Sequence, residues 1–436
     1  MDAKTDQSPE TAPQSILVAV CDLNGVARGK RLPASQGPKV LNGDIRMPLS
    51  LPTVDIWGRD IDGSPMIFES GDGDGLCRPC RSQILPAPWL GPRASYVPVW
   101  MFNEDGSPST VDPRQALAAV LNRFEAQGLT PVVATELEFY LSPASAGHAP
   151  FPSEGVLSLQ QLGTVGSLLD DIYAACALHD VPADAAISEC GPGQFEINLT
   201  HRSDALLAAD DAVIFKSIVR GFAQQHGFKA SFMAKPLGNA AGSGLHVHFS
   251  LLDASGRNVF DDGSDAGSDV LLHAVAGVLE ALPESTLIFA PHFNSYRRLR
   301  PNTHAPTAVT WGYENRTAAV RIPGGPAAAR RIEHRVAGAD ANPYLVLAAV
   351  LGAALRGMNR QQTPQPPLHG DSYRAEAESL PLDWGAAIAA FEDGPTIADI
   401  FPDQMRSIFA MGKRQELARF QDEVTPFERQ SYEDHV

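Results

Sequence analysis

Hydrophobic and polar positions alternate with a period of two in several short stretches of the chain. In Glu136-Leu-Glu138-Phe-Tyr140, the two acids and the tyrosine share one face, and the apolar residues share the other. Similar alternation recurs over residues 194–199, 245–251 and 331–335. Each of these stretches predicts a β-strand with one apolar and one polar face.

Other stretches have the longer period of helices. Asp112 can cap a helix, Pro113 suits its first turn and Gly128 can end it. Further helices are predicted over residues 157–178, 204–225, 268–282 and 342–358. Because these helices are interleaved with the short strands, residues 111–436 are predicted to form one α/β or α+β catalytic domain.

The N-terminal part has a different character. Residues 1–14 are polar and are predicted to be a disordered tail. A strand over 15–21, the turn dipeptide Asn24-Gly25 and a returning strand over 26–32 predict a hairpin. The following residues are dense in Gly, Pro and Asp, which favours sheet and loop, so residues 15–110 are expected to form a small β-rich domain.

The polar faces of the strands carry glutamate, histidine and arginine almost exclusively. For a single strand, outward-facing charge at a sheet edge would be an adequate explanation, but four such strands together favour a shared polar cavity. The candidate contents are Glu136, Glu138, Glu189, Glu196, Glu333 and His246. Clustered acids would repel one another unless cations neutralised them, and ligation mainly by oxygen selects Mg²⁺ or Mn²⁺, with two or more ions in the site.

Arginines are concentrated between positions 297 and 335. They are Arg297, Arg298, Arg300, Arg316, Arg321, Arg330, Arg331 and Arg335. Arginine binds carboxylates and phosphates through two parallel hydrogen bonds, so metals and arginines together are typical of phosphoryl transfer. A surface network paired with acids is the alternative for Arg297, Arg300 and Arg330. A two-metal hydrolase would use similar acids but would leave the arginines without a role.

Composition excludes some function classes. The chain has 436 residues, 44% of them apolar and 19% charged, which is typical of a soluble globular protein. A net charge of −17 disfavours nucleic acid as a partner. Residues 344–355 are the longest apolar stretch and are too short to span a bilayer, so no membrane partner is expected.

The five cysteines form no disulfide pattern, and the first residues lack the apolar core of a signal peptide, which predicts a cytoplasmic location. Cys77 and Cys80 could be half of a zinc site or a redox pair, but no second pair follows, and a loop is expected there.

Taken in order, these motifs resemble those of glutamine synthetases and of their relatives that form γ-glutamyl amides, the glutamate–amine ligases. The matching segments are Glu136-Leu-Glu138-Phe, Glu189-Cys-Gly-Pro-Gly-Gln-Phe-Glu196, Lys235-Pro, Gly242-Ser-Gly-Leu-His246-Val-His248, Asn294-Ser-Tyr-Arg-Arg298-Leu, Asn315-Arg316-Thr, Arg321-Ile-Pro, Arg331-Ile-Glu333-His-Arg335 and Asn342-Pro-Tyr. The resemblance runs from Asp112 to the C-terminus and, more loosely, back to Ile16. It implies an α+β protein with an N-terminal β-grasp domain and a catalytic domain. In the catalytic domain a curved antiparallel sheet, flanked by helices, forms a funnel. The resemblance also implies a ring-shaped homo-oligomer, with a dodecamer as the expected form and active sites between subunits.

The resemblance also implies a role for each site residue. Glu138, Glu189 and Glu196 would hold one metal ion, and Glu136, His246 and Glu333 a second. His248, Ser250, Arg316 and Arg321 would bind ATP. Gly242, Arg298 and Arg335 would bind the amino-acid substrate, and Arg316 and Arg298 would be catalytic residues. His304 is a further candidate catalytic residue because of the chemistry of its imidazole and not because of the resemblance.

Two positions depart from glutamine synthetases that use ammonia. His304 stands where those enzymes carry a glutamate that binds ammonium, and Ala241 stands where they carry an asparagine. The loss of the acid favours an organic amine, such as a polyamine or a small alkylamine, over ammonia. Two roles stay open for His304: a base that takes the proton of the amine, or a loop residue without a catalytic role.

The expected activity is therefore an ATP-dependent ligase. Glutamate would be activated as γ-glutamyl phosphate, and an amine would displace phosphate to leave a γ-glutamyl amide. A glutamine synthetase that uses ammonia is the alternative within this class. A catalytically silent scaffold or nitrogen sensor is the alternative from another class.

Overall fold

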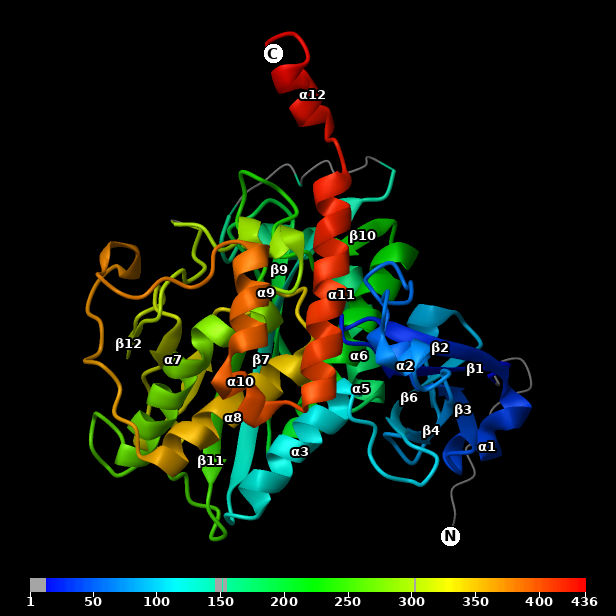
Figure 1. Ribbon diagram of the computed structural model, residues 1–436, viewed down its shortest axis with the longest axis horizontal. Coiled ribbons are helices and arrows are strands. Elements are labelled where there is room, and N and C mark those ends of the chain that lie inside the picture. The colour runs from blue at the N-terminus through cyan, green and yellow to red at the C-terminus, as the bar shows by residue number, and fades with distance from the viewer. Residues whose placement is uncertain (1–12, 146–150, 152–154, 302) are drawn as a thin grey trace.

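The computed structural model describes the chain except for residues 1–12, 146–150, 152–154 and 302 (Figure 1). Most of the expected disordered tail, residues 1–12, lies outside the described residues. Two sheets organise the described part, one formed by residues before 103 and one by residues 130–334. The domain boundary expected between residues 110 and 111 stays a prediction.

The N-terminal sheet has six strands in the order β2-β1-β6-β4-β3, with β5 beside β6. The strands are β1 (Ser15–Cys21), β2 (Ala27–Pro33), β3 (Ile45–Pro48), β4 (Asp74–Pro79), β5 (Leu85–Pro86) and β6 (Ala94–Phe102). β1 pairs antiparallel with β2, as the predicted hairpin requires, and Gly25 in its turn has φ +75°. β1 also pairs in parallel with β6, so the sheet is mixed. The loop expected at Cys77 is wrong, because Cys77 lies fully buried within β4, between β3 and β6.

The second sheet has eight strands in the order β12-β13-β14-β11-β7-β9-β8, with β10 beside β7. The strands are β7 (Thr130–Pro143), β8 (Ala183–Ser188), β9 (Gln194–Arg202), β10 (Phe228–Ser231), β11 (Leu245–Leu252), β12 (Trp311–Tyr313), β13 (Val320–Ile322) and β14 (Ile332–His334). The strand predicted around Glu136 is the middle of the long central strand β7. The sheet is antiparallel except between β12 and β13, which run parallel because residues 314–319 return the chain to the starting end of β12.

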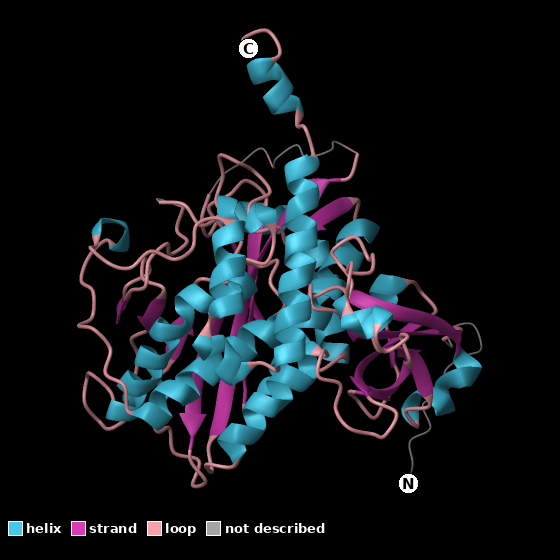
Figure 2. Cartoon of the chain, viewed as in Figure 1, coloured by secondary structure: helices cyan, strands magenta, loops and turns pink. Residues whose placement is uncertain are grey.

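Helices pack against this sheet, and Figure 2 shows the long strands lying behind them. Among them are α3, α5, α6 and α7, which contact its strands. The helices of the described chain are α1 (Gly37–Leu41), α2 (Pro65–Phe68), α3 (Pro113–Glu125), α4 (Leu159–Thr164), α5 (Gly166–Leu178), α6 (Ala205–Gln225), α7 (Asp269–Phe289), α8 (Pro343–Arg360), α9 (Trp384–Asp393), α10 (Pro395–Ile400), α11 (Asp403–Asp422) and α12 (Pro426–Tyr432). The apolar face of β7 packs toward α6, and the rings of Phe139 and Phe215 lie 6.5 Å apart. The opposite, polar face of the sheet is therefore left to form a site.

Most of the predicted helices were confirmed with similar bounds, and two of them differ from the prediction in where they end or break. Asp112 caps α3 through the amides of its first turn. The single helix expected over 157–178 is two helices, because Val165 leaves the helical conformation (φ −117°, ψ 16°) between the glycines at 163 and 166. α7 continues beyond residue 282 despite Pro283, since most of its length is buried in the core.

α7 is long and apolar enough, by length and composition, to cross a membrane. However, 72% of its most apolar window is buried inside the protein. It packs against α8, whose residues are also mostly buried. Both helices therefore lie in the interior of the protein, as core helices do.

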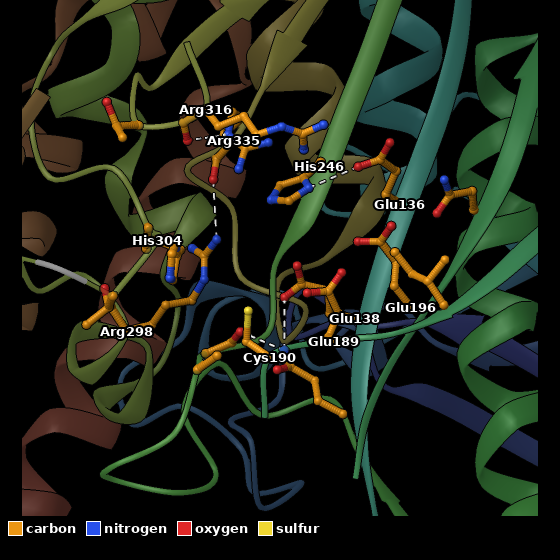
Figure 3. A pocket seen from close by; sticks show the side chains of 18 of the residues that line it. Glu136, Glu138, Glu189, Cys190, Glu196, His246, Arg298, His304, Arg316 and Arg335 are labelled. Carbon is orange, nitrogen blue, oxygen red and sulfur yellow. Dashed lines mark hydrogen bonds and ion pairs between the residues drawn. The ribbon is translucent and has the colours of Figure 1, made fainter. Parts of the chain in front are cut away.

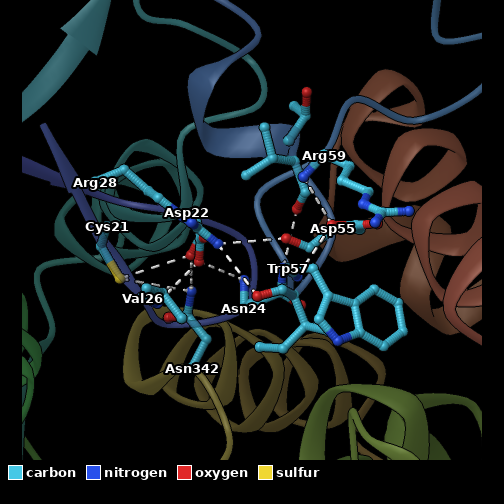
Figure 4. A network of polar contacts seen from close by, with 12 residues as sticks. Cys21, Asp22, Asn24, Val26, Arg28, Asp55, Trp57, Arg59 and Asn342 are labelled. Atoms are coloured by element: carbon cyan, nitrogen blue, oxygen red, sulfur yellow. Dashed lines mark hydrogen bonds and ion pairs between the residues drawn. The ribbon is translucent and has the colours of Figure 1, made fainter.

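A buried polar network joins the N-terminal sheet to α8 (Figure 4). Asp22 is fully buried, and its carboxylate accepts hydrogen bonds from the amides of Asn24 and Val26 and from Arg28 Nε, at 2.8–2.9 Å. Burial raises the pKa of Asp22 to about 6, against the opposing effect of Arg28. Asn342 Nδ2 donates to the main-chain oxygen of Asp22 at 2.8 Å, while its Oδ1 caps α8. The side chain of Asn342 therefore connects the N-terminal sheet to the start of α8.

Candidate active site

Strand register brings the predicted acids and histidines together. The Cα partners across neighbouring strands are Glu136 and His246, Glu138 and Glu196, and His248 and Glu333. Because partners on neighbouring strands point to the same face, these side chains share the polar side of the sheet. Figure 3 shows Glu136 and Glu138 of β7, Glu196 of β9 and His246 of β11 close together, with Glu189 of the loop between β8 and β9 beside them.

A cavity of about 380 Å³ lies on this side, and we call it the first cavity. Of the predicted site residues it is lined by Glu136, Glu138, Glu189, Glu196, Gly242, His246, Arg298, His304, Arg316 and Arg335. The predicted residues that do not line it are His248, Ser250, Arg321 and Glu333. Side chains far apart in the chain thus meet at one place, as the polar strand faces predicted.

Two groups of side chains could hold metal ions. Ligand atoms of Glu136, His246 and Glu333 lie within 4.8 Å of one another, as do those of Glu138, Glu196 and His246. The first group is the set predicted for one metal ion. The second contains Glu138 and Glu196, two of the three residues predicted for the other metal ion, together with His246. The third predicted residue, Glu189, lines the same cavity, and its role as a ligand stays a prediction.

Burial and, after it, the charges of neighbouring acids raise the pKa values of two acids on β7 and β9. Burial and the charge of Glu189 raise the pKa of Glu138 to about 7. Burial and the charges of Glu136, Glu138 and Glu189 raise the pKa of Glu196 to about 9. Such carboxylates hold protons at neutral pH unless a cation replaces them, so the cluster fits a divalent metal site.

Glu136 is held differently. Its carboxylate oxygens lie 3.1 Å from His246 Nδ1 and 2.9 Å from His248 Nε2. Although burial opposes ionisation, these two histidines hold the pKa of Glu136 well below its usual range. Burial and then Arg335 lower the pKa of His246, which keeps that ring neutral and able to offer a lone pair to a metal ion.

Glu333 is paired with arginines on both sides. Its carboxylate accepts a hydrogen bond from Arg321 Nη1 at 2.8 Å and another from Arg335. Burial opposes ionisation of Glu333, but the charge of Arg335, followed by those of other nearby groups, lowers its pKa to about 2. Arg321, predicted to face phosphates, lies buried against Glu333 and lines neither this cavity nor the one described next. Its role in binding phosphate stays a prediction.

A second cavity, of about 520 Å³, lies beside the first. His248, Ser250 and Arg331 line it, and Arg331 Nε lies 3.3 Å from His248 Nδ1. Glu136 and Asn198 line both cavities. The two cavities therefore meet at the wall that carries a candidate metal ligand.

Arg298 is buried at the other side of the first cavity. Its guanidinium donates to the main-chain oxygen of Val336 at 2.6 Å and to that of Arg335 at 3.3 Å. Gly242 packs directly on it, because a Cβ built at Gly242 would lie 2.7 Å from Arg298 Cγ and 2.7 Å from the oxygen of Ala234. The protein's own packing therefore requires a glycine at position 242, in addition to any contact that Gly242 makes with a substrate.

His304 and Arg316 are exposed on loops at the rim of the first cavity. His304 has φ +63°, a left-handed conformation that is uncommon for residues other than glycine. Arg316 is fixed through its main-chain oxygen, which accepts from Arg335 Nε at 3.2 Å. Both side chains are free to meet a ligand in the cavity.

Three of the cavity residues without a role assigned from sequence are Gln194, Cys190 and Tyr373. Gln194 Nε2 donates to Gly242 O at 2.9 Å and reaches Glu138 Oε2 at 3.3 Å, so it links two walls of the cavity. Cys190 exposes its thiol to the cavity beside Glu189. Gln194 and Cys190 lie inside the segment 189–196, whose resemblance to a family motif is the sequence signal that could have pointed to them. Tyr373 lies in a segment without any motif, so no signal pointed to it.

A model of the family "Glutamine synthetase, catalytic domain" matches residues 110–432. The chain belongs to the glutamine synthetase family. The gamma-glutamylputrescine synthetase PuuA of Escherichia coli (strain K12) is 36% identical over 428 residues, which cover 95% of this chain and 90% of that protein. The gamma-glutamylethanolamide synthetase GlnA4 of Streptomyces coelicolor is 34% identical, with 96% and 92% covered. A solved structure of GmaS in complex with ADP has a TM-score of 0.86 at 29% identity, with 98% of both chains covered.

Membership in the glutamine synthetase family confirms the expected family and the expected α+β fold. The acids and His246 supply ligand groups suited to divalent metal ions, as the family implies. The individual roles of the site residues, including His304, stay predictions.

Proposed function

We propose that the protein is an ATP-dependent ligase that joins the γ-carboxylate of glutamate to an organic amine. The observation that carries this proposal is the pair of adjoining cavities with Glu136 and Asn198 in their common wall. A nucleotide in the second cavity would direct its terminal phosphate toward an acid bound in the first. The relatives named for γ-glutamyl amides of putrescine and ethanolamine support an amine as the acceptor.

The chain's residues would divide the work. Arg298 and Arg335 would bind glutamate, and Arg316 would stabilise charge on the moving phosphoryl group. His248, Ser250 and Arg321 would bind ATP. Glu136, Glu138, Glu189, Glu196, His246 and Glu333 would hold two or more Mg²⁺ or Mn²⁺ ions. Bound there, the ions would neutralise the negative charge of the phosphates.

His304 carries the choice of acceptor in this proposal. It stands at the rim of the first cavity and is exposed, while Ala241 leaves space nearby. A neutral imidazole attracts ammonium less than a carboxylate does, and it can accept a proton from an incoming amine. An organic amine is therefore favoured over ammonia.

The test measures ADP release with ATP, Mg²⁺ and glutamate across ammonium, methylamine, ethanolamine, putrescine and spermidine, with products identified by mass. One organic amine should exceed ammonium by at least about a hundredfold in kcat/KM, the size of effect that loss of one charged group can cause. If ammonium is used best, the protein is a glutamine synthetase, and the interpretation of His304 and Ala241 is wrong. If no amine releases ADP and ATP does not bind with metal, a silent scaffold or sensor is supported instead.

A ring-shaped homo-oligomer, with a dodecamer as the expected form, and a cytoplasmic location belong to this proposal as well. Light scattering on the purified protein measures its mass in solution. A monomeric mass would contradict the proposed assembly.

A further inference from the structure

Residues 368–374 form a strap that docks on the loop carrying Arg316. Asn315 Nδ2 donates to the main-chain oxygens of residues 368 and 370, at 3.2 and 2.8 Å. The amide of Ser372 donates to Thr317 Oγ1 at 3.0 Å, and the hydroxyl of Ser372 donates to the main-chain oxygen of Thr317. The strap ends in a short 3₁₀ turn, Ser372–Arg374, which brings Tyr373 to the wall of the first cavity. The strap is therefore fixed at several points.

Tyr373 uses this fixed position to hold another segment. Its hydroxyl donates to the main-chain oxygen of Ala305 at 2.8 Å. On the other side of His304, Thr303 Oγ1 lies 2.6 and 2.7 Å from the main-chain oxygens of Arg298 and Arg300. The segment 303–305, which lines the cavity, is thus attached on both sides of His304.

The hydrogen bonds on both sides of His304 hold its backbone in an uncommon conformation. The left-handed conformation of His304 is uncommon for residues other than glycine, and contacts with the surroundings help to maintain it. Ala305 is 1% exposed, so its position is set by packing and by the bond from Tyr373. Removing that bond would let the segment relax away from the cavity.

We propose that Tyr373 is a positioning residue that holds segment 303–305 as the wall of the amine subsite, so that the amine meets the activated acid and water does not. This inference rests on the proposed function. In the productive step the amine nitrogen forms a bond to the carbonyl carbon of the γ-glutamyl phosphate, and the bond from that carbon to the phosphate oxygen breaks. Phosphate then leaves with the electron pair, and the amine gives its proton to a base or to solvent. If water attacks instead, the products are glutamate and phosphate, and ATP is used without amide formation.

The test compares Tyr373→Phe with Tyr313→Phe. Tyr313 is a matched control because its hydroxyl also donates to an alanine oxygen, that of Ala266, at 2.8 Å, and it lines neither cavity. The wild type is first assayed with the panel of amines to find its best acceptor. Amide formed per ADP and the KM values for amine and ATP are then measured for each variant.

Tyr373→Phe should raise the amine KM and lower the amide formed per ADP by about fivefold, the usual effect of losing one neutral hydrogen bond. Its KM for ATP should stay at the wild-type value, and Tyr313→Phe should keep wild-type coupling. Unchanged coupling in Tyr373→Phe, or equal loss in both variants, would overturn the inference while leaving the proposed function intact. Absence of amide from the wild type with every amine would instead overturn the proposed function itself.

Ser372→Ala provides a second, milder variant. It removes the bond from the Ser372 hydroxyl to Thr317 and so loosens the strap without changing Tyr373. A smaller fall in amide per ADP is expected. Should Tyr373→Phe prove unstable, wild-type coupling in Ser372→Ala would overturn the inference.

Discussion

Replacement of Gly242 by alanine tests whether packing around Arg298 controls glutamate binding. The new Cβ would lie 2.7 Å from the main-chain oxygen of Ala234 and 2.7 Å from Arg298 Cγ, below the 3.0 Å that Cβ atoms essentially never cross. The oxygen of Ala234 also accepts from the amide of Ser243 at 2.9 Å, so this side of the contact is rigid. Arg298 is the neighbour that has to move.

The size of the effect follows from what Arg298 would lose. Relief of such an overlap in a packed site costs about 1–3 kcal/mol. Moving the guanidinium weakens its bonds to Val336 and Arg335, and a displacement of about 1 Å in a binding group can cost about a hundredfold in rate. We therefore expect Gly242→Ala to lower kcat/KM for glutamate by about 10- to 100-fold.

The assay is steady-state ADP release at saturating ATP and amine, with glutamate varied. Gly238→Ala is the matched control, because a Cβ at Gly238 meets nothing within 4 Å and its backbone lies outside the left-handed region. That variant should keep wild-type kinetics. A Gly242→Ala enzyme with wild-type kcat/KM for glutamate would refute the reasoning, since it would mean that the overlap is relieved without moving Arg298.

Three further predictions concern the acids and the exposed thiol. Glu196→Gln should weaken Mg²⁺ or Mn²⁺ binding by more than about tenfold in calorimetry, because it removes a ligand charge; equal affinity would exclude Glu196 from the metal site. Metal affinity of the wild type should rise with pH, because Glu138 and Glu196 must release protons before they bind a metal ion. Their pKa values are raised to about 7 and about 9, so both carboxyl groups stay protonated below those values. A metal affinity that is independent of pH between 6 and 9 would contradict this prediction. Cys190 should react first with a maleimide, as it is the exposed thiol in the part of the chain that the structure describes, and glutamate with ADP should slow the reaction; peptide mapping would show whether a buried cysteine reacts instead.

The sequence predicted the parts of the site that lie on regular strands. Alternation around Glu136 and Glu138 was visible because a strand exposes every second residue, and burial of Leu137 and Phe139 confirms the assignment. Which acids would meet could not be worked out from alternation, because it depends on strand register, that is, on long-range pairing. The closeness of His246 to Glu138 and Glu196 is therefore visible only in the structure, and the role of Glu189 as a ligand stays a prediction.

Other features lacked a local signal altogether. Tyr373 reaches the cavity through a strap without periodicity, and its place depends on bonds to Asn315 and Thr317, which are distant in sequence. The pairing of Arg321 with Glu333 was missed for a similar reason: a family motif names the residue but not the partner that it contacts. The C-terminal helices α9 to α12 were not predicted: α9, α10 and α12 are short, and the longer α11 has only a weak apolar periodicity.

The shared position of Asn342 has a consequence for how the molecule comes apart on heating. Its Oδ1 caps the start of α8, and its Nδ2 donates to the main-chain oxygen of Asp22. Detachment of the N-terminal sheet would therefore remove a hydrogen-bond partner of the residue that begins α8. Loss of either bond leaves a buried amide group without its partner, which costs about 1–3 kcal/mol. The two units are thereby coupled, and a calorimeter should record one cooperative heat-absorption peak rather than two.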